Sequence, residues 1–117
     1  FNLAPGKTVP LKTKPQTWQT MPGAVAGEPV KEQMNTCIKE LYNRMDQNRY
    51  HIIGIGGIST AEDAYEKIQL GASLVQLLTG LIYEGPNLIR QINKGLLHLL
   101  ERDGLSSISQ AVGTKNT

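Results

Sequence analysis

Residues 52–59 read Ile-Ile-Gly-Ile-Gly-Gly-Ile-Ser, and this stretch decides the fold. It continues a short apolar run over residues 50–55 that is rich in isoleucine and bounded by glycine. Such a run is typical of a strand buried on both faces, as the strands of parallel sheets usually are. The Ser-Thr-Ala-Glu that starts at Ser59 matches a capping box, in which two side chains bond the backbone at a helix start. We therefore expect a helix with Ser59 as its N-cap and Glu62 reaching back, ending at Gly71.

Similar elements flank this strand and helix. A second apolar run predicts a strand over residues 73–78, and apolar positions at helical spacing predict helices that follow Pro29 and Gly85-Pro86. Two strands joined by a helix should be parallel, with a right-handed crossover. A two-stranded parallel sheet buried on both faces cannot stand alone, because its edges would carry unpaired backbone groups that water cannot reach. The sequence therefore predicts part of a larger α/β sheet or barrel, whose other strands this chain does not contain.

The composition is that of an ordinary soluble domain. The chain has 117 residues, 39% of them hydrophobic and 19% charged, which suits one folded domain and excludes a disordered chain. A net charge of +2 is too small to indicate nucleic-acid binding, for which a clustered basic face is expected. The one cysteine, Cys37, excludes a disulfide framework and a Cys-based zinc cluster, and its place in an apolar helical stripe favours core packing.

Residues 71–83, the longest nearly apolar stretch, fall short of the roughly 20 residues that a membrane-spanning helix needs. Because the chain begins with Phe1 rather than Met, we expect a piece of a longer protein.

The first 23 residues are rich in proline and lysine and contain no acidic residue. Proline at this density opposes both helix and central strand, so we expect a solvated surface loop. A phosphate-binding role for the lysines is the alternative. We divide the chain into a loop over residues 1–22 and one domain segment over residues 23–117.

Gly56 and Gly57 lie where the predicted strand ends and the predicted helix begins. Backbone N–H groups point outward at such a place and the helix dipole favours an anion, while glycine lets a phosphate approach the main chain. The dinucleotide-binding fingerprint does not fit, because Ser59 replaces its third glycine and no acidic residue lies about 20 residues further on. Taken alone, the turn fits a phosphate site and a purely structural tight turn equally well.

A second turn of this kind, Thr79-Gly80, ends the next predicted strand. In (β/α)8 barrels the loops after the seventh and eighth strands frequently form one phosphate site, so the two turns together favour phosphate binding.

No acid–base pair is visible at these loop ends. His51 begins a strand at the opposite edge of the sheet and His98 falls within a long helix, so we expect structural or surface roles for both. No catalytic residue and no metal ligand is assigned.

A resemblance to a known family rests on four segments in order, namely residues 52–58, 64–68, 71–77 and 85–86. Together they resemble the C-terminal third of dihydroorotate dehydrogenase. The Gly-Ala-Ser-Leu-Val-Gln that opens the third segment, and the Ala-Val-Gly of residues 111–113, are similar to class 2, the quinone-dependent branch.

The resemblance implies an α/β fold, a (β/α)8 TIM barrel with FMN at the carboxyl end of its strands. This chain would contribute about the seventh and eighth strands with their helices, as the C-terminal part of one FMN-binding domain. In the family, the FMN phosphate is held by main-chain N–H groups of glycines that match Gly27, Gly56 and Gly57, and by residues that match Leu78 and Thr79. A side chain added at Gly57 is therefore expected to take the place of a phosphate oxygen.

Two positions depart from the family pattern. Ala26 stands where the family has a serine, so a hydroxyl near the cofactor is absent. Leu78 stands where a tyrosine is frequent, which keeps a backbone contact and loses a phenol hydrogen bond. The catalytic base, a serine in class 2 enzymes, matches nothing in this chain and is expected in earlier barrel strands.

By this resemblance the intact enzyme oxidises (S)-dihydroorotate to orotate in de novo pyrimidine (UMP) biosynthesis, passing hydride to FMN and electrons to the quinone, ubiquinone. Its partner would be the remaining N-terminal part of the barrel. An N-terminal segment would associate peripherally with a membrane, the mitochondrial inner membrane or, in a prokaryote, the bacterial inner membrane. The alternative is a non-catalytic phosphate-binding module or subunit on the same architecture, since fold does not fix function. A yellow sample with flavin absorbance would separate the enzyme from this alternative.

Overall fold

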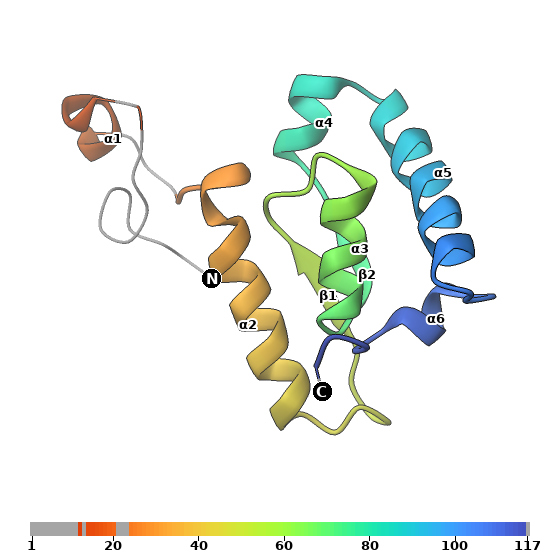
Figure 1. The fold of residues 1–117 in the computed structure, drawn as a ribbon. Coiled ribbons are helices and arrows are strands. Elements are labelled where there is room, and N and C mark those ends of the chain that lie inside the picture. Colours follow the sequence, from red (N-terminus) through yellow and green to blue (C-terminus); the bar gives the residue numbers. More distant parts are fainter. Residues whose placement is uncertain (1–11, 13, 21–23, 117) are drawn as a thin grey trace.

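Helices cover one side of a short sheet in the arrangement that Figure 1 shows. The computed structural model describes residues 12, 14–20 and 24–116. In chain order the elements are α1 (Pro15–Thr20), η1 (Glu28–Val30), α2 (Lys31–Arg44), β1 (Ile52–Ile55), α3 (Ala61–Gln69), β2 (Ala72–Gln76), α4 (Thr79–Glu84), α5 (Asn87–Arg102) and α6 (Ile108–Ala111).

The strands β1 and β2 lie side by side and run parallel, which confirms the prediction from the sequence. Their register pairs Ile53 with Leu74 and Gly54 with Val75, after an irregularity next to Ile52. The connection between them is α3, which packs against β2, while α2 packs against β1 and α5 packs against α3.

The two faces of this sheet differ in burial. Ile52 and Gly54 are buried on the side of the helices, whereas Ile53 is 58% exposed and Leu74 is 63% exposed on the other side. The prediction of strands buried on both faces is therefore met on one face, because no described part of the chain covers the other. An apolar face this open is what we expect of a sheet that continues beyond two strands.

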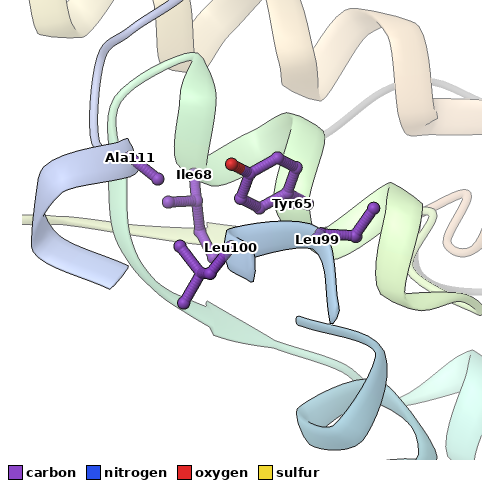
Figure 2. Packing of buried hydrophobic residues seen from close by; sticks show 5 residues of the cluster. All are labelled: Tyr65, Ile68, Leu99, Leu100 and Ala111. Carbon is purple, nitrogen blue, oxygen red and sulfur yellow. The ribbon is translucent and has the colours of Figure 1, made fainter. Parts of the chain in front are cut away.

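The largest apolar cluster lies between α3, α5 and α6. Five side chains that are each at most 9% exposed form it, as Figure 2 shows: Tyr65, Ile68, Leu99, Leu100 and Ala111. The Tyr65 hydroxyl at its edge donates a hydrogen bond to Asp103 Oδ2 at 2.8 Å, so the ring is buried without an unpaired polar group. The cluster fixes α5 against α3 and thereby the direction in which α3 leaves β1.

Two helices lie where the sequence analysis places none. Within the proline-rich segment, α1 forms because Pro15 stands at its first position, where the missing N–H costs nothing, so the loop prediction is wrong there. The second, α4, begins at Thr79, and β2 ends at Gln76, two residues before the predicted end of the strand. The remaining proline-rich positions, residues 1–11, 13 and 21–23, lie outside the described residues.

The N-cap of α3 is Thr60, so the prediction of Ser59 with Glu62 is wrong by one residue. Thr60 Oγ1 accepts the Asp63 N–H at 3.2 Å, and Asp63 Oδ2 accepts the Thr60 N–H at 3.0 Å, which completes a capping box. Both hydroxyl residues are followed by an acidic residue three positions later. The second pairing forms, and its Asp63 also makes an ion pair with Lys31 of α2.

Candidate functional site

Three turns lie at the end of the sheet where β1 and β2 finish, the upper end in Figure 1. One turn holds Gly27, directly before η1. The second follows β1 and holds Gly56 and Gly57, and the third follows β2 and holds Leu78 and Thr79. The five residues that the family resemblance assigns to FMN therefore share one edge of the sheet.

Close approaches of the main chain join these three turns. A Cβ atom at Gly27 would lie 2.9 Å from Thr79 Cγ2, and one at Gly80 would run into the carbonyl oxygen of Ile58. Gly27 also has a φ of 84°, which glycine adopts at low cost and other residues do not. The structure thus brings the first turn against the third, and the third against the second.

The glycine pair after β1 faces the start of α2. Gly56 and Gly57 have φ values of 97° and 69°, so both need the left-handed region. A Cβ atom at Gly56 would lie 3.0 Å from Met34 Cγ, and one at Gly57 would lie 2.8 Å from the Cα of Lys31. The expectation that a side chain at Gly57 would take the place of a phosphate oxygen is therefore wrong, because α2 fills that space.

The starts of α3 and α4 differ in what they can offer an anion. At α3, Asp63 Oδ2 accepts the N–H groups of Ser59 and Thr60, each at 3.0 Å, and the Ser59 hydroxyl at 3.2 Å. A carboxylate of the chain itself therefore occupies the helix start that the sequence analysis expects to attract an anion. At α4 the N-cap residue is Leu78 and no side chain caps the helix. Since the first N–H groups of a helix have no acceptor within it, the start of α4 has donors for an external anion.

Lys31 neutralises the carboxylate at α3. Its Nζ forms an ion pair with Asp63 Oδ1. Burial acts to raise the pKa of Asp63, but hydrogen bonds from Lys31, the Ser59 backbone and Thr60 outweigh it and hold the pKa below its ordinary value. The same hydrogen bond raises the pKa of Lys31. Both groups are therefore charged at neutral pH, and the pair adds no net charge to the turn.

Lys67, which the sequence analysis does not single out, is fully buried on α3. Its Nζ donates to Asn35 Oδ1 at 2.6 Å, and Asn35 Nδ2 donates to Glu66 Oε2 at 3.1 Å. Burial lowers the pKa of this lysine. Its stem lies under β1, where a Cβ at Gly54 would be 3.3 Å from Lys67 Cδ. These contacts join α2 to α3. The signal in the sequence is that Lys67 follows Ala64, which is also fully buried, by three residues and so lies on the same face of α3.

The two departures from the family pattern are both open to solvent. Leu78 is 62% exposed and Ala26 is exposed. Neither side chain therefore fills the interior of this part of the protein, and the backbone of Leu78 stays at the start of α4.

The histidines and the cysteine lie outside the three turns. The ring of His51 contacts the Ser73 hydroxyl at 3.3 Å before β1, His98 is exposed on α5, and Cys37 is half-buried on α2. Among the described residues, no group of three or more His, Cys, Asp or Glu side chains could hold a metal ion. In the same part of the chain, no helix has the length and apolar character to cross a membrane.

The family model for dihydroorotate dehydrogenase matches residues 3–100. This chain belongs to the dihydroorotate dehydrogenase family. The match runs through all three turns, so the candidate site lies within the part of the chain that defines the family.

Curated relatives named dihydroorotate dehydrogenase (quinone) are similar to this chain. The one from Halobacterium salinarum is 50% identical over 91 residues, which cover 78% of this chain and 25% of the relative. The one from Crocosphaera subtropica is 47% identical over 107 residues, which cover 92% of this chain and 28% of the relative. The resemblance to the quinone-dependent branch is thus confirmed, and the chain spans about a quarter of the length of these relatives. Because relatives occur in bacteria and archaea, the comparison does not support a mitochondrial location.

Solved structures of the family share this fold. The crystal structure of ligand-free DHODH from Eimeria tenella aligns with a TM-score of 0.81 and 30% identity, covering 93% of this chain and 30% of that chain. DHODH from Eimeria tenella in complex with ferulenol aligns with a TM-score of 0.77 and 31% identity, covering 88% and 28%. The parallel α/β arrangement is therefore that of part of a dihydroorotate dehydrogenase.

Proposed function

We propose that this chain forms part of the FMN phosphate site of a quinone-dependent dihydroorotate dehydrogenase. The whole enzyme oxidises (S)-dihydroorotate to orotate in de novo pyrimidine (UMP) biosynthesis, with a quinone as electron acceptor. The observation that carries the proposal is the close approach of Gly27 to Thr79. It brings two turns that are far apart in the sequence to one place. Family membership supplies the class of reaction.

The residues present fit a phosphate group. Five residues would hold it, through main-chain N–H groups and a hydroxyl: Gly27, Gly56, Gly57, Leu78 and Thr79. Positive φ values at Gly27, Gly56 and Gly57 shape the first two turns, and in the third turn α4 begins without a side-chain cap, so its first N–H groups would meet a phosphate. Since Lys31 pairs with Asp63, no uncompensated carboxylate at the start of α3 opposes the phosphate charge.

When bound, FMN supplies the redox chemistry, and this chain holds and orients its phosphate end. A proton-transfer group is not assigned to any residue here. The catalytic base and the ligands of orotate belong to the remaining N-terminal part of the enzyme, together with the segment that associates peripherally with a membrane and gives access to the quinone.

The open face of the sheet supports a barrel. Ile53, Ile55 and Leu74 are between 45% and 63% exposed there, and an apolar surface of this kind is normally covered by further structure. We propose that it lines the interior of a (β/α)8 barrel, to which the chain contributes about the seventh and eighth strands. Residues 23–117 are then the C-terminal segment of a single domain.

The test uses the full-length protein, reconstituted with FMN and freed of excess flavin by gel filtration. We expect a stoichiometric flavin absorbance that bleaches when dihydroorotate is added without oxygen and returns when a quinone is added. A protein that retains FMN but is not bleached by dihydroorotate would refute the proposed activity. It would not contradict the proposed phosphate site. A colourless protein would refute both and favour a phosphate-binding module without catalysis.

A further inference from the structure

The Lys31–Asp63 ion pair joins the two elements that follow the glycine turns. Lys31 is the first residue of α2, and Asp63 lies in the first turn of α3. Their side chains are 25% and 10% exposed, so solvent screens this pair much less than a pair on the surface. Both carboxylate oxygens are used, because Oδ1 accepts from Lys31 and Oδ2 accepts from the backbone N–H groups that precede α3.

Each partner is connected in turn to one of the glycine turns. The N–H of the residue before Lys31 donates to the carbonyl oxygen of Gly27 at 3.2 Å. On the other side, Asp63 accepts the N–H of Ser59 at 3.0 Å, two residues after Gly57. A continuous series of contacts therefore runs from the first turn through the ion pair to the second.

We propose that Lys31 and Asp63 are positioning residues for the cofactor. They hold the turn of Gly56 and Gly57 at a fixed place relative to the turn of Gly27, and thereby set the affinity of the protein for the phosphate end of the flavin. This inference rests on the proposed function and deepens it. Neither side chain is assigned a contact with the flavin or the substrate.

Charge gives the pair a property that a purely structural contact lacks. Backbone N–H groups already hold Asp63 in place, so removing Lys31 leaves a nearly buried carboxylate without its counter-charge. This charge repels a phosphate dianion and has no such effect on riboflavin, which lacks the phosphate. Loss of Lys31 is therefore expected to weaken FMN binding selectively.

The experiment measures the dissociation constants of FMN and riboflavin for the full-length protein stripped of flavin, by quenching of flavin fluorescence. Lys31→Met is expected to weaken FMN binding by roughly ten- to a hundredfold, in line with the loss seen at metal sites when a residue that orients a ligand is removed. Riboflavin affinity is expected to stay unchanged, and Lys31→Arg is expected to restore most of the FMN affinity. The matched control is Arg44→Met, which breaks the exposed Arg44–Glu40 pair at the other end of α2 and should change neither constant.

A double variant tests the charge argument separately. Asp63→Asn keeps an oxygen for the N–H groups of Ser59 and Thr60 but removes the charge. Combined with Lys31→Met, it is therefore expected to bind FMN better than Lys31→Met alone, but less tightly than the unaltered protein, because the ion pair no longer holds the two turns together. If Lys31→Met does not fold, Lys31→Gln replaces it, because glutamine keeps an N–H donor toward Asp63 without the charge.

The outcomes separate the two proposals. Equal losses for FMN and riboflavin, or no loss for either, would overturn the positioning role while FMN binding by the unaltered protein upholds the proposed function. Stronger FMN binding in Asp63→Asn alone, with weaker binding in Lys31→Met, would make Lys31 a direct phosphate ligand and also overturn positioning. An unaltered protein that binds no FMN would overturn the proposed function, and the positioning role with it.

Discussion

Gly27 lies so close to Thr79 that a methyl group on its Cα would sit 2.9 Å from Thr79 Cγ2. The turn before η1 and the turn after β2 are therefore packed main chain against side chain. Because packed interiors respond to a single added methyl group, a side chain added at Gly27 is expected to displace Thr79.

We expect Gly27→Ala to reduce the FMN retained by the full-length protein. The substitution strains a φ of 84° and forces Thr79 to shift, which displaces the start of α4. The matched control is Gly85→Ala, because Gly85 has a φ of 79° and no atom within 4 Å of its Cβ position. That control should show the backbone cost alone, about 1–3 kcal/mol for a conformation that is essentially restricted to glycine. Bound FMN per protein after gel filtration and the urea midpoint are measured, and equal behaviour of the two variants would contradict the contact.

Gly57→Ala should destabilise the protein more than Gly104→Ala. The two glycines have φ values of 69° and 70°, so alanine would have to adopt a positive φ at both positions. At Gly57 the new methyl group meets the Cα of Lys31, whereas nothing lies within 4 Å at Gly104. Overpacking of this kind costs about 1–3 kcal/mol, which we expect as the difference between the two unfolding free energies. A difference near zero in urea denaturation would show that α2 moves away freely.

Thr60→Ala should cost more stability than Ser59→Ala. Thr60 caps α3 through its side chain, and loss of an N-cap costs about 1 kcal/mol. Ser59 contributes its hydroxyl to Asp63 at 3.2 Å but keeps the backbone N–H bond when its side chain is removed. Urea denaturation of the two variants measures the order, and a larger loss for Ser59→Ala would return the cap to Ser59.

The Lys31–Asp63 pair should make stability depend on pH at the acid end. Because the pKa of Asp63 is lowered in the folded state, its contribution is present above the unfolded value of about 3.9 and is lost as pH falls through the folded value. The pKa of Lys31 is raised, so its contribution is present below the unfolded value of about 10.4 and is lost as pH rises through the folded value. Asp63→Asn should flatten the acid limb of the urea midpoint plotted against pH. An unchanged limb in that variant would assign the acid sensitivity to other carboxylates.

The 117-residue chain on its own should not unfold cooperatively. Ile53 and Leu74 leave one face of the sheet open, and two parallel strands carry unpaired edges. We expect the isolated monomer to bind an apolar dye such as ANS and to lose its circular dichroism gradually on heating. A sharp thermal transition without dye binding would show that the chain covers this face itself.

The order of strands and helices could be predicted because periodicity and glycine positions report local structure. The isoleucine-rich run of β1 and the similar run of β2 predict a parallel pair, and the ends of parallel strands meet at one edge. That reasoning suffices to group Gly56 and Thr79 before any coordinates are known. The helix α4 could not be predicted in this way, because a helix of six residues is too short to show an apolar period.

Contacts between distant segments could not be predicted in this way. Nothing local indicates that Gly57 faces Lys31 or that Lys67 is buried against Asn35. The local pattern also does not distinguish Thr60 from Ser59 as N-cap, because both are followed three residues later by an acidic residue, of which Asp63 has an ion-pair partner on α2. Contacts with residues that are distant in the sequence are therefore needed where two residues match a local pattern equally well.

Because the space beside Gly57 belongs to α2, packing alone disfavours a larger residue there, whether or not the turn binds a flavin. A descendant that lost flavin binding would still be penalised for replacing Gly57, since the helix would have to move. The Gly56-Gly57 pair is therefore expected to persist in paralogues that have no cofactor. In such proteins the presence of this motif would not indicate that the protein binds a flavin.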